Sequence, residues 1–309
     1  MDRIIVSGAD ARYFPLLAEL HRSLAERGVL DRAALGVVDC GLSADQRMAL
    51  ESAGAEVAKA DWGFDFPLRE TVEATVPGLK AMTARPMLPQ LFPGRRLVMW
   101  LDADTWVQDA GIVELFFATA DRGALAATLE LDRAYAHLRV GRRYWDHLAR
   151  WWEEASASTE TAEAMAWRPI INSGAFAMPA DAPVWRSWLR TTRAWYGRQT
   201  EMRRSTPLVE QFALNFVAYR GGYPLVPLPT RCNWLCHLAM PAWDPATGRL
   251  CDPLPPHEPL GLVHVCDWTK NYPHDIAGLD GTTRRMRITY PPTPEAPWAA
   301  KNADGESAG

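Results

Sequence analysis

Two aspartates one residue apart, Asp102 and Asp104, follow a strongly apolar run in the segment LVMWLDADTWV. In an extended segment alternate side chains share a face, so we expect both carboxylates to point the same way at the open end of a buried strand. Close carboxylates repel each other unless a positive charge sits between them, and their oxygens suit Mg²⁺ or Mn²⁺. The pair therefore predicts a divalent-metal site, although a solvated pair at a turn would have the same spacing.

A third ligand is offered by His264, which lies in a second apolar segment, LVHVCD. A neutral imidazole is a good ligand for Mn²⁺. Lys270 follows six residues later, and its ammonium could reach a phosphate bound to the same metal. Taken alone, His264 could equally be a core histidine and Lys270 a surface charge, so the prediction depends on these positions meeting in space.

Hydrophobic periodicity predicts the elements that would carry these residues. Strand and helix alternate from residue 3 to residue 60, which favours a parallel sheet with right-handed crossovers and a nucleotide site beyond its carboxyl ends. No GxGxxG follows the first strand, which argues against a classical dinucleotide site. The expected strands are 3–7, 34–39, 55–60, 96–104, 123–130, 170–179 and 261–267, and the expected helices are 13–27, the segment from Ser43 to Gly54, 79–92, 181–197 and 207–221.

Three further stretches have distinct compositions. Residues 135–168 are rich in Trp, Tyr, Arg and Glu and are expected to form one or two amphipathic helices. From residue 222 onward the chain is rich in proline, and we expect loops apart from the strand at 261–267. The tail, 291–309, is rich in Pro, Ala and polar residues and is expected to be disordered.

The composition excludes some classes of partner. The chain has 309 residues and a formal net charge of -4, so no broad basic surface for nucleic acid is expected. No apolar run approaches the roughly 20 residues needed to cross a bilayer. Five scattered cysteines argue against a disulfide framework and favour a reducing cytoplasm. A zinc site at Cys232, Cys236, His237 and Cys251 is a weaker alternative to buried thiols, because the spacing is not that of a zinc finger.

Together, the D-x-D motif of Asp102 and Asp104 and the H-x5-K motif of His264 and Lys270 resemble family 8 of the glycosyltransferases, the group of bacterial lipooligosaccharide galactosyltransferases and glycogenin. The resemblance extends over most of residues 3–272. The segments that match the family, in their order along the chain, are IIVSGADARY, VVDCGLSADQR, TARPML, WLDADTWV, INSGAFAM, EQFALN and HVCDWTKNY.

The resemblance implies an α/β protein with the GT-A fold, a Rossmann-like arrangement in which a mixed, mainly parallel central sheet is flanked by helices. Residues 1–290 would form a single GT-A domain, followed by the tail. The segment 135–168 is longer than in simple members of the family. We expect it to be a helical insertion that forms a lid or a wall of the acceptor site.

The activity implied by the resemblance is metal-dependent transfer of a hexose from a UDP-sugar to an acceptor hydroxyl, with retention at the anomeric carbon. The cofactor would be Mn²⁺, with Mg²⁺ possible, held by Asp102, Asp104 and His264. Donor-binding roles fall on Ala9, Asp10, Tyr13, Arg85, Ala103, Glu130, Asn172, Ser173 and Gly174. Catalytic roles fall on Gln211, Glu210 and Lys270, with Asp10 and Tyr13 on the uracil and Lys270 on the departing phosphate.

The chain also departs from the family pattern. Phe212 replaces a carboxylate, Glu210 replaces a shorter aspartate, and Asp267 stands where the family has glycine; Asn271 and Tyr272 replace the usual Pro-Trp. These departures keep two alternatives open, a catalytically weak protein that binds nucleotide sugars and a sugar-nucleotide hydrolase on the same fold. The donated hexose, the acceptor and the oligomeric state are not indicated by the sequence.

Overall fold

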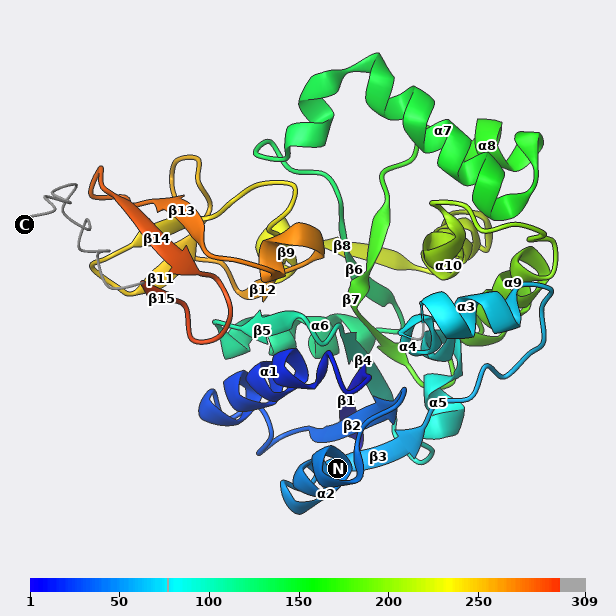
Figure 1. The fold of residues 1–309 in the computed structure, drawn as a ribbon, viewed down its shortest axis with the longest axis horizontal. Helices are drawn as coiled ribbons and strands as arrows, with labels where there is room; N and C mark the ends of the chain where they lie inside the picture. The colour runs from blue at the N-terminus through cyan, green and yellow to red at the C-terminus, as the bar shows by residue number, and fades with distance from the viewer. Residues whose placement is uncertain (77, 295–309) are drawn as a thin grey trace, which may run out of the picture.

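The computed structural model describes residues 1–76 and 78–294 of the chain. Its centre is a seven-stranded sheet in the order β3-β2-β1-β4-β7-β6-β8. Figure 1 shows this sheet running through the middle of the molecule with helices on both sides. The strands are β1 Arg3–Ala9, β2 Ala34–Asp39, β3 Glu56–Lys59, β4 Leu97–Leu101, β6 Leu125–Leu129, β7 Ile171–Pro179 and β8 Leu225–Leu228.

The sheet is mixed but mainly parallel, as expected. β1 pairs in parallel with β2 and β4, β2 pairs in parallel with β3, and β6 pairs in parallel with β8. The exception is β7, which is antiparallel to both β4 and β6. As a result, the start of β7 lies beside the carboxyl ends of β4 and β6, where the predicted site residues follow the strands.

Both faces of the sheet are covered, which explains why its strands read as continuous apolar runs. Along β4, Val98 and Trp100 face one apolar core, and Leu97, Met99 and Leu101 face the other. The second core is completed by α1 Phe14–Glu26, α2 Ala44–Ser52 and α6 Ala110–Ala120. The first is completed by α3 Arg69–Thr75, α4 Leu79–Ala84, α5 Leu88–Leu91, α9 Val184–Tyr196 and α10 Val209–Arg220.

The helix expected at 79–92 is broken into three pieces. α4 is followed by the 3₁₀ turn Arg85–Met87 and then by α5. Pro86 and Pro89 each lie in the first turn of a piece. Proline lacks an N–H and is tolerated only there, so the break places Arg85 at a helix end rather than on a helix surface.

The segment 135–168 forms helices, as expected. They are the 3₁₀ helix Ala136–Val140, α7 Arg142–Ser156 and α8 Thr159–Met165, with Ser158 capping α8. α7 and α8 lie above α10 in Figure 1. α7 is fastened there by Trp152, which is fully buried and packs edge-on against Phe212 with 4.6 Å between the ring centroids.

After residue 222 the expected strand at 261–267 is present as β12, but the prediction of loops elsewhere was wrong. Besides β8, strands there form three small sheets, one of them with β5, in the orders β5-β12-β9, β10-β11 and β13-β14-β15, around a third apolar core. The strands are too short to show periodicity in the sequence. Their bounds are β5 Thr105–Val107, β9 Trp234–Leu235, β10 Ala242–Asp244, β11 Arg249–Cys251, β12 Leu262–His264, β13 His274–Ala277, β14 Thr283–Arg287 and β15 Thr293–Pro294.

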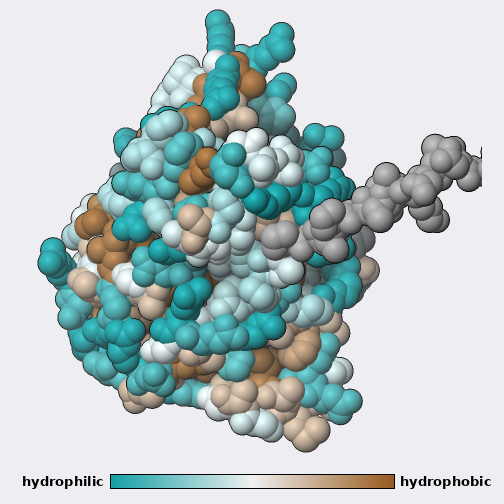
Figure 2. All heavy atoms as spheres, turned by 90° about the vertical axis from the view of Figure 1, so that its left-hand side faces the viewer, coloured by the Kyte–Doolittle hydropathy of each residue, from teal (hydrophilic) through white to brown (hydrophobic). Residues whose placement is uncertain are grey.

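Figure 2 views the molecule from the side on which these small sheets lie, and hydrophobic residues there form small separate groups among hydrophilic ones. Of the predicted tail, residues 295–309 lie outside the described residues, whereas Thr293 pairs with Arg287. Within the part of the chain that the structure describes, no helix has the length and apolar character needed to cross a membrane.

Candidate active site

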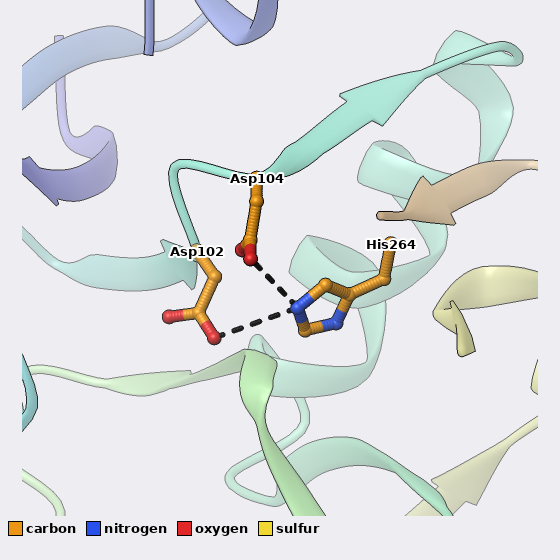
Figure 3. A group of neighbouring side chains, drawn as sticks. All are labelled: Asp102, Asp104 and His264. Carbon is orange, nitrogen blue, oxygen red and sulfur yellow. Dashed lines mark ion pairs between the residues drawn. The ribbon is translucent and has the colours of Figure 1, made fainter. Parts of the chain in front are cut away.

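Asp102 and Asp104 lie in a turn between β4 and β5, not in an extended strand as predicted. The Thr105 N–H donates to the Asp102 carbonyl across the turn at 3.0 Å, and the Asp102 N–H donates to the Gly174 carbonyl of β7 at 2.8 Å. The turn still directs both carboxylates to the same side, as Figure 3 shows. The convergence therefore comes from the turn and its attachment to β7 rather than from strand alternation.

His264 reaches this turn because β12 pairs antiparallel with β5, which places His264 opposite Thr105. Its Nε2 lies 3.3 Å from Asp104 Oδ1 and 3.7 Å from Asp102 Oδ2 (Figure 3). The ligand atoms of the three residues all lie within 4.8 Å of one another, and this is the one such group of His, Cys, Asp or Glu among the described residues. The structure thus brings together the three predicted ligands.

Each carboxylate has one oxygen fixed by the protein and one directed at His264. Asp102 Oδ1 accepts hydrogen bonds from the Arg85 guanidinium and from Trp100 Nε1, the latter at 2.7 Å. Asp104 Oδ2 accepts from Lys270 Nζ at 2.5 Å. The remaining oxygens, Asp102 Oδ2 and Asp104 Oδ1, are the two that face the imidazole.

A chain of buried side-chain amides fixes the imidazole tautomer. The Gly174 N–H donates to Asn172 at 3.0 Å, so the atom there must be the oxygen Oδ1, and Nδ2 of Asn172 donates to Glu130 Oε1 at 2.9 Å. Asn233 donates through Nδ2 to the same Asn172 oxygen at 2.9 Å. The Asn233 oxygen is therefore the atom that faces His264 Nδ1, at 3.0 Å.

It follows that Nδ1 of His264 carries a proton and donates it to Asn233. A neutral imidazole then has a bare lone pair on Nε2 that points at two carboxylate oxygens. The convergence calls for positive charge between these three atoms, which either a proton on Nε2 or a metal ion can supply. An imidazole whose other nitrogen donates to an oriented oxygen is the usual arrangement of a metal ligand. The group therefore fits Mn²⁺ or Mg²⁺ in donor type and orientation.

Asn233 was not identified from the sequence. It lies 31 residues before His264 and 61 after Asn172, and only the pairing of β9 with β12 brings it to the site. It is 1% exposed, so its amide is committed to these two partners. No spacing in the segment RCNWLCH could have indicated this role.

Gly174 is required by the close approach of β7 to the metal ligands. A Cβ on this residue would lie 2.7 Å from Asp102 Oδ2 and would collide with His264 Cε1. Glycine at this position therefore lets the backbone of β7 approach Asp102 and His264 closely.

Arg85 lies beneath the site. It is 2% exposed, and its Nη1 donates to Ser173 Oγ and to Glu210 Oε2, both at 2.8 Å, while Nη2 pairs with Asp102. The guanidinium thus links β4, β7 and α10, and it lies neither on a helix surface nor in the solvent. Burial raises the pKa of Glu210 to about 7, against the opposing effect of Arg85.

Ser173 and Gln211 are joined directly. Gln211 Oε1 accepts from the Ser173 N–H at 2.9 Å and from Ser173 Oγ at 3.1 Å. Asn215, one turn further along α10, accepts from the Ile171 N–H at 2.7 Å and donates to the Ile171 carbonyl at 2.8 Å. These bonds hold the start of β7 against α10 and leave the Gln211 carbonyl oxygen already occupied.

Asp10 and Tyr13 follow β1, beside the end of β4. Asp10 Oδ1 accepts from the Arg12 and Tyr13 N–H groups at 2.9 and 3.0 Å. Lys270 Nζ lies 4.9 Å from the centre of the Tyr13 ring, so Lys270 connects Tyr13 to Asp104. The two small residues predicted at this edge, Ala9 and Ala103, are 3% and 5% exposed.

The surroundings favour the charged form of Asp104 and disfavour the charged form of Glu130. Without a metal ion, burial opposes ionisation of Asp104, but a protonated His264 and Lys270 outweigh it and lower its pKa. Burial also opposes the charge on Lys270, yet Asp104 raises its pKa. For Glu130 burial is the dominant effect and raises the pKa, because only Asn172 and the more distant His264 act against it.

The departures from the family pattern have clear structural settings. Phe212 is 2% exposed and belongs to the first core, where it contacts Trp152. Asp267 has a φ of 56°, the left-handed conformation that favours glycine, and its side chain is exposed. Lys270 pairs with Asp104 rather than with Asp267.

The zinc alternative receives no support from the structure. Among the described residues, the four candidate positions do not form a group of three metal-ligating atoms. Cys236 is buried, and burial raises its pKa, which disfavours the thiolate. His237 instead contacts Cys266, with 2.7 Å between Nδ1 and Sγ.

Comparison with known proteins identifies the fold. No protein-family model matches the sequence, and no curated protein matches it. Among solved structures, the galactosyltransferase LgtC in complex with donor and acceptor sugar analogs is similar with a TM-score of 0.51 and 16% identity, over 86% of this chain and 88% of that one. An active-site mutant of LgtC is similar with a TM-score of 0.50 and 16% identity, over 85% and 87% of the two chains.

At this level of identity a likeness bears on the fold alone. The seven-stranded mixed sheet and its flanking helices are those of the similar structures over most of both chains. The chain therefore has the GT-A glycosyltransferase fold, as the resemblance implied.

Proposed function

We propose that the protein is a metal-dependent, retaining glycosyltransferase that moves a hexose from a UDP-sugar to an acceptor hydroxyl. The observation that carries the proposal is the convergence of Asp102, Asp104 and the bare Nε2 of His264 at the carboxyl end of β4. In open α/β sheets this edge is where nucleotides bind. The fold adds support, because the similar LgtC structure contains donor and acceptor sugar analogs.

The metal would be held by Asp102, Asp104 and His264. A bound Mn²⁺ or Mg²⁺ supplies Lewis-acid stabilisation of the negative charge on a leaving diphosphate. Lys270 supplies a second positive charge, because its Nζ already lies 2.5 Å from Asp104 Oδ2. Asp10 and Tyr13, at the end of β1, are the residues that we assign to the uracil.

Arg85 acts as a positioning residue in this proposal. Its guanidinium holds Asp102, Ser173 and Glu210 at once, so the metal side and the sugar side of the site keep a constant separation. We assign the donor sugar to Glu130, Asn172 and Ser173, with Glu210 and Gln211 beneath it. A contact of Arg85 with the donor is not needed.

In the transfer step the bond between the anomeric carbon and the β-phosphate oxygen breaks, and a bond from the acceptor oxygen to that carbon forms on the same face. The proton of the acceptor hydroxyl passes to the departing phosphate oxygen, which leaves UDP as product. Gln211 is a poor nucleophile, and its carbonyl oxygen already accepts two hydrogen bonds from Ser173. We therefore favour front-side attack over a covalent glycosyl-enzyme.

The test is a panel of UDP-sugars assayed for Mn²⁺-dependent release of UDP, with and without a mixture of hydroxyl acceptors. We expect one UDP-hexose to be turned over by the wild type and Asp104→Ala to lose on the order of 10²-fold or more in rate. Asp31→Ala is the matched control, because Asp31 is an exposed carboxylate outside the site.

The outcomes separate the proposal from the two alternatives. Release of UDP that acceptors do not increase would identify a sugar-nucleotide hydrolase. Tight binding of UDP without turnover of any UDP-sugar would identify a nucleotide-sugar-binding protein. Turnover that does not change with Mn²⁺ or with Asp104→Ala would contradict the metal assignment.

A further inference from the structure

A pocket of about 360 Å³ lies beside the site and is lined by none of the three metal ligands. It is bounded by α7, by α10 and by the residues that follow β6 and β9. Small-molecule sites in proteins have volumes of roughly 300–1,000 Å³. The pocket is therefore large enough for one small ligand next to the proposed donor.

Most of the pocket wall is apolar. α7 contributes Tyr144, Leu148 and Trp151, and the α10 side contributes Leu208 and Phe212. Burial raises the pKa of Tyr144, so its ring and hydroxyl stay neutral. These side chains offer wide hydrophobic surfaces and few hydrogen-bonding groups.

Six of the lining residues are polar: Glu130, Gln211, Asp267 and the histidines His137, His147 and His237. Two of them, Glu130 and Gln211, belong to the metal and sugar network. Glu130 accepts a hydrogen bond from Asn172, and Gln211 accepts from Ser173. Asp267 also lines the pocket and lies three residues before Lys270. A ligand in the pocket would thus meet polar groups at Glu130, Gln211 and the three histidines, and apolar groups along the wall that Leu148, Trp151 and Phe212 form.

We propose that this pocket binds the acceptor, and that the acceptor is a hydroxyl-bearing molecule with a flat apolar or aromatic body rather than a sugar. The proposal rests on the function proposed above and specifies its acceptor class. Its hydroxyl faces Gln211 and Glu130, and its ring system packs against Trp151, Leu148 and Phe212.

Two physical arguments favour this occupant over a sugar. A hexose in the pocket would place several hydroxyl groups against Leu148, Leu208 and Phe212, where they would lose hydrogen bonds to water without gaining others. A flat apolar body loses no hydrogen bonds there, and it gains from burial of its surface and from contact with aromatic rings.

The experiment measures binding of two probes to the full chain by calorimetry, without donor or metal: 2-naphthol as the aromatic alcohol and methyl β-galactoside as the sugar. We expect 2-naphthol to bind at least about tenfold more tightly than the glycoside, given its larger apolar surface. Trp151→Ala is expected to weaken 2-naphthol binding about tenfold or more, since large aromatic contacts dominate such sites.

Trp167→Ala is the matched control. Trp167 belongs to the same insertion and stacks on Trp145, but it is 69% exposed and does not line the pocket. It should leave 2-naphthol binding unchanged. Tyr144→Ser provides a second variant at a half-buried position, so that the test does not depend on correct folding of Trp151→Ala.

Equal or tighter binding of the glycoside, or wild-type binding of 2-naphthol by both pocket variants, would overturn the proposal. The same samples are then assayed for UDP release and, by mass spectrometry, for glycosylated naphthol. UDP release without any binding of naphthol would contradict the proposed acceptor class but not the proposed transferase function. Naphthol binding with no UDP release from any UDP-sugar would remove the transferase proposal and leave an apolar-ligand site.

Discussion

The metal group and the pocket under α7 lie side by side but are built in opposite ways. Around Asp102 and His264 the side chains are polar and linked by hydrogen bonds, apart from the three atoms that face the proposed metal, and both residues lie at the ends of strands. Around Trp151 and Phe212 the contacts are apolar, and the residues come from helices of the insertion and of α10. In the function that we propose, the sheet end binds the cation and the donor, and the helices bind the acceptor.

This comparison implies that the two regions respond independently to mutation. Changes in the hydrogen-bonded network should alter metal affinity, because ligand orientation depends on it. Changes in the apolar wall should alter stability or acceptor binding and leave the metal affinity constant. Each prediction below tests one side of that separation.

The largest effect is expected from His264→Ala. It removes the nitrogen ligand and leaves the Asn233 oxygen without its donor, so Mn²⁺ affinity should fall on the order of 10²-fold or more. Electron paramagnetic resonance of free Mn²⁺ measures this without substrate. His21→Ala, on α1, should bind Mn²⁺ like the wild type; a wild-type affinity in His264→Ala would remove the imidazole from the site.

Gly174→Ala should disturb the ligands through a single methyl group. The added Cβ would lie 2.7 Å from Asp102 Oδ2, so that carboxylate must move. Overpacking of this kind costs about 1–3 kcal/mol, which corresponds to a loss of metal affinity of up to about a hundredfold. Gly78→Ala is the control, because a Cβ there meets nothing within 4 Å. Equal Mn²⁺ affinities of the two variants would show that the ligands are not closely packed against β7.

Asn233→Ala should weaken Mn²⁺ binding about tenfold or more, because His264 would lose the acceptor that holds its tautomer. Asn233→Asp keeps an oxygen opposite Nδ1 but loses the donor to Asn172, so a smaller loss is expected. Titration of Mn²⁺ by calorimetry ranks the three proteins. If both variants bound Mn²⁺ like the wild type, the amide chain would have no part in metal binding.

Phe212→Leu tests the apolar side. The smaller side chain loses contact with Trp152, and we expect a loss of about 1 kcal/mol in the free energy of unfolding. Urea denaturation measures this loss, with Tyr272→Leu as a control because Tyr272 is 49% exposed. Mn²⁺ affinity should stay at the wild-type value; a parallel fall in affinity would mean that the two regions are coupled.

The smallest effect concerns pH. Burial lowers the pKa of His237 to about 4, so between that value and its ordinary pKa of 6.5 the unfolded chain binds a proton that the folded chain does not. The free energy of unfolding therefore falls as the pH drops, by about 1 kcal/mol from His237 between roughly pH 7 and pH 5.5. Urea denaturation of the wild type and His237→Gln at both pH values measures it. Identical pH dependence in the two proteins would contradict a buried neutral His237.

Much of the fold was predictable, because its signals are local. The apolar runs of β1, β2 and β4 and the capping residue Ser43 of α2 appear where periodicity and cap chemistry predict them, and Ser43 and Gln46 form a reciprocal capping box. Apart from β12, the strands of the small sheets after residue 222 were missed, since strands of two to five residues are too short for periodicity. Their stability comes from partners distant in the chain.

For the candidate site, too, local features were predictable from the sequence and long-range contacts were not. The sequence by itself determined the chemical types available, two carboxylates after an apolar strand and an imidazole six residues before a lysine, since these follow from residue identity and spacing. The tertiary structure decided which atoms face one another. The pairing of β12 with β5, the amide chain through Asn233, the burial of Arg85 and the contact of Lys270 with Asp104 join residues between 17 and 166 positions apart. Such contacts are set by the packing of whole elements, and no local pattern of residues encodes them.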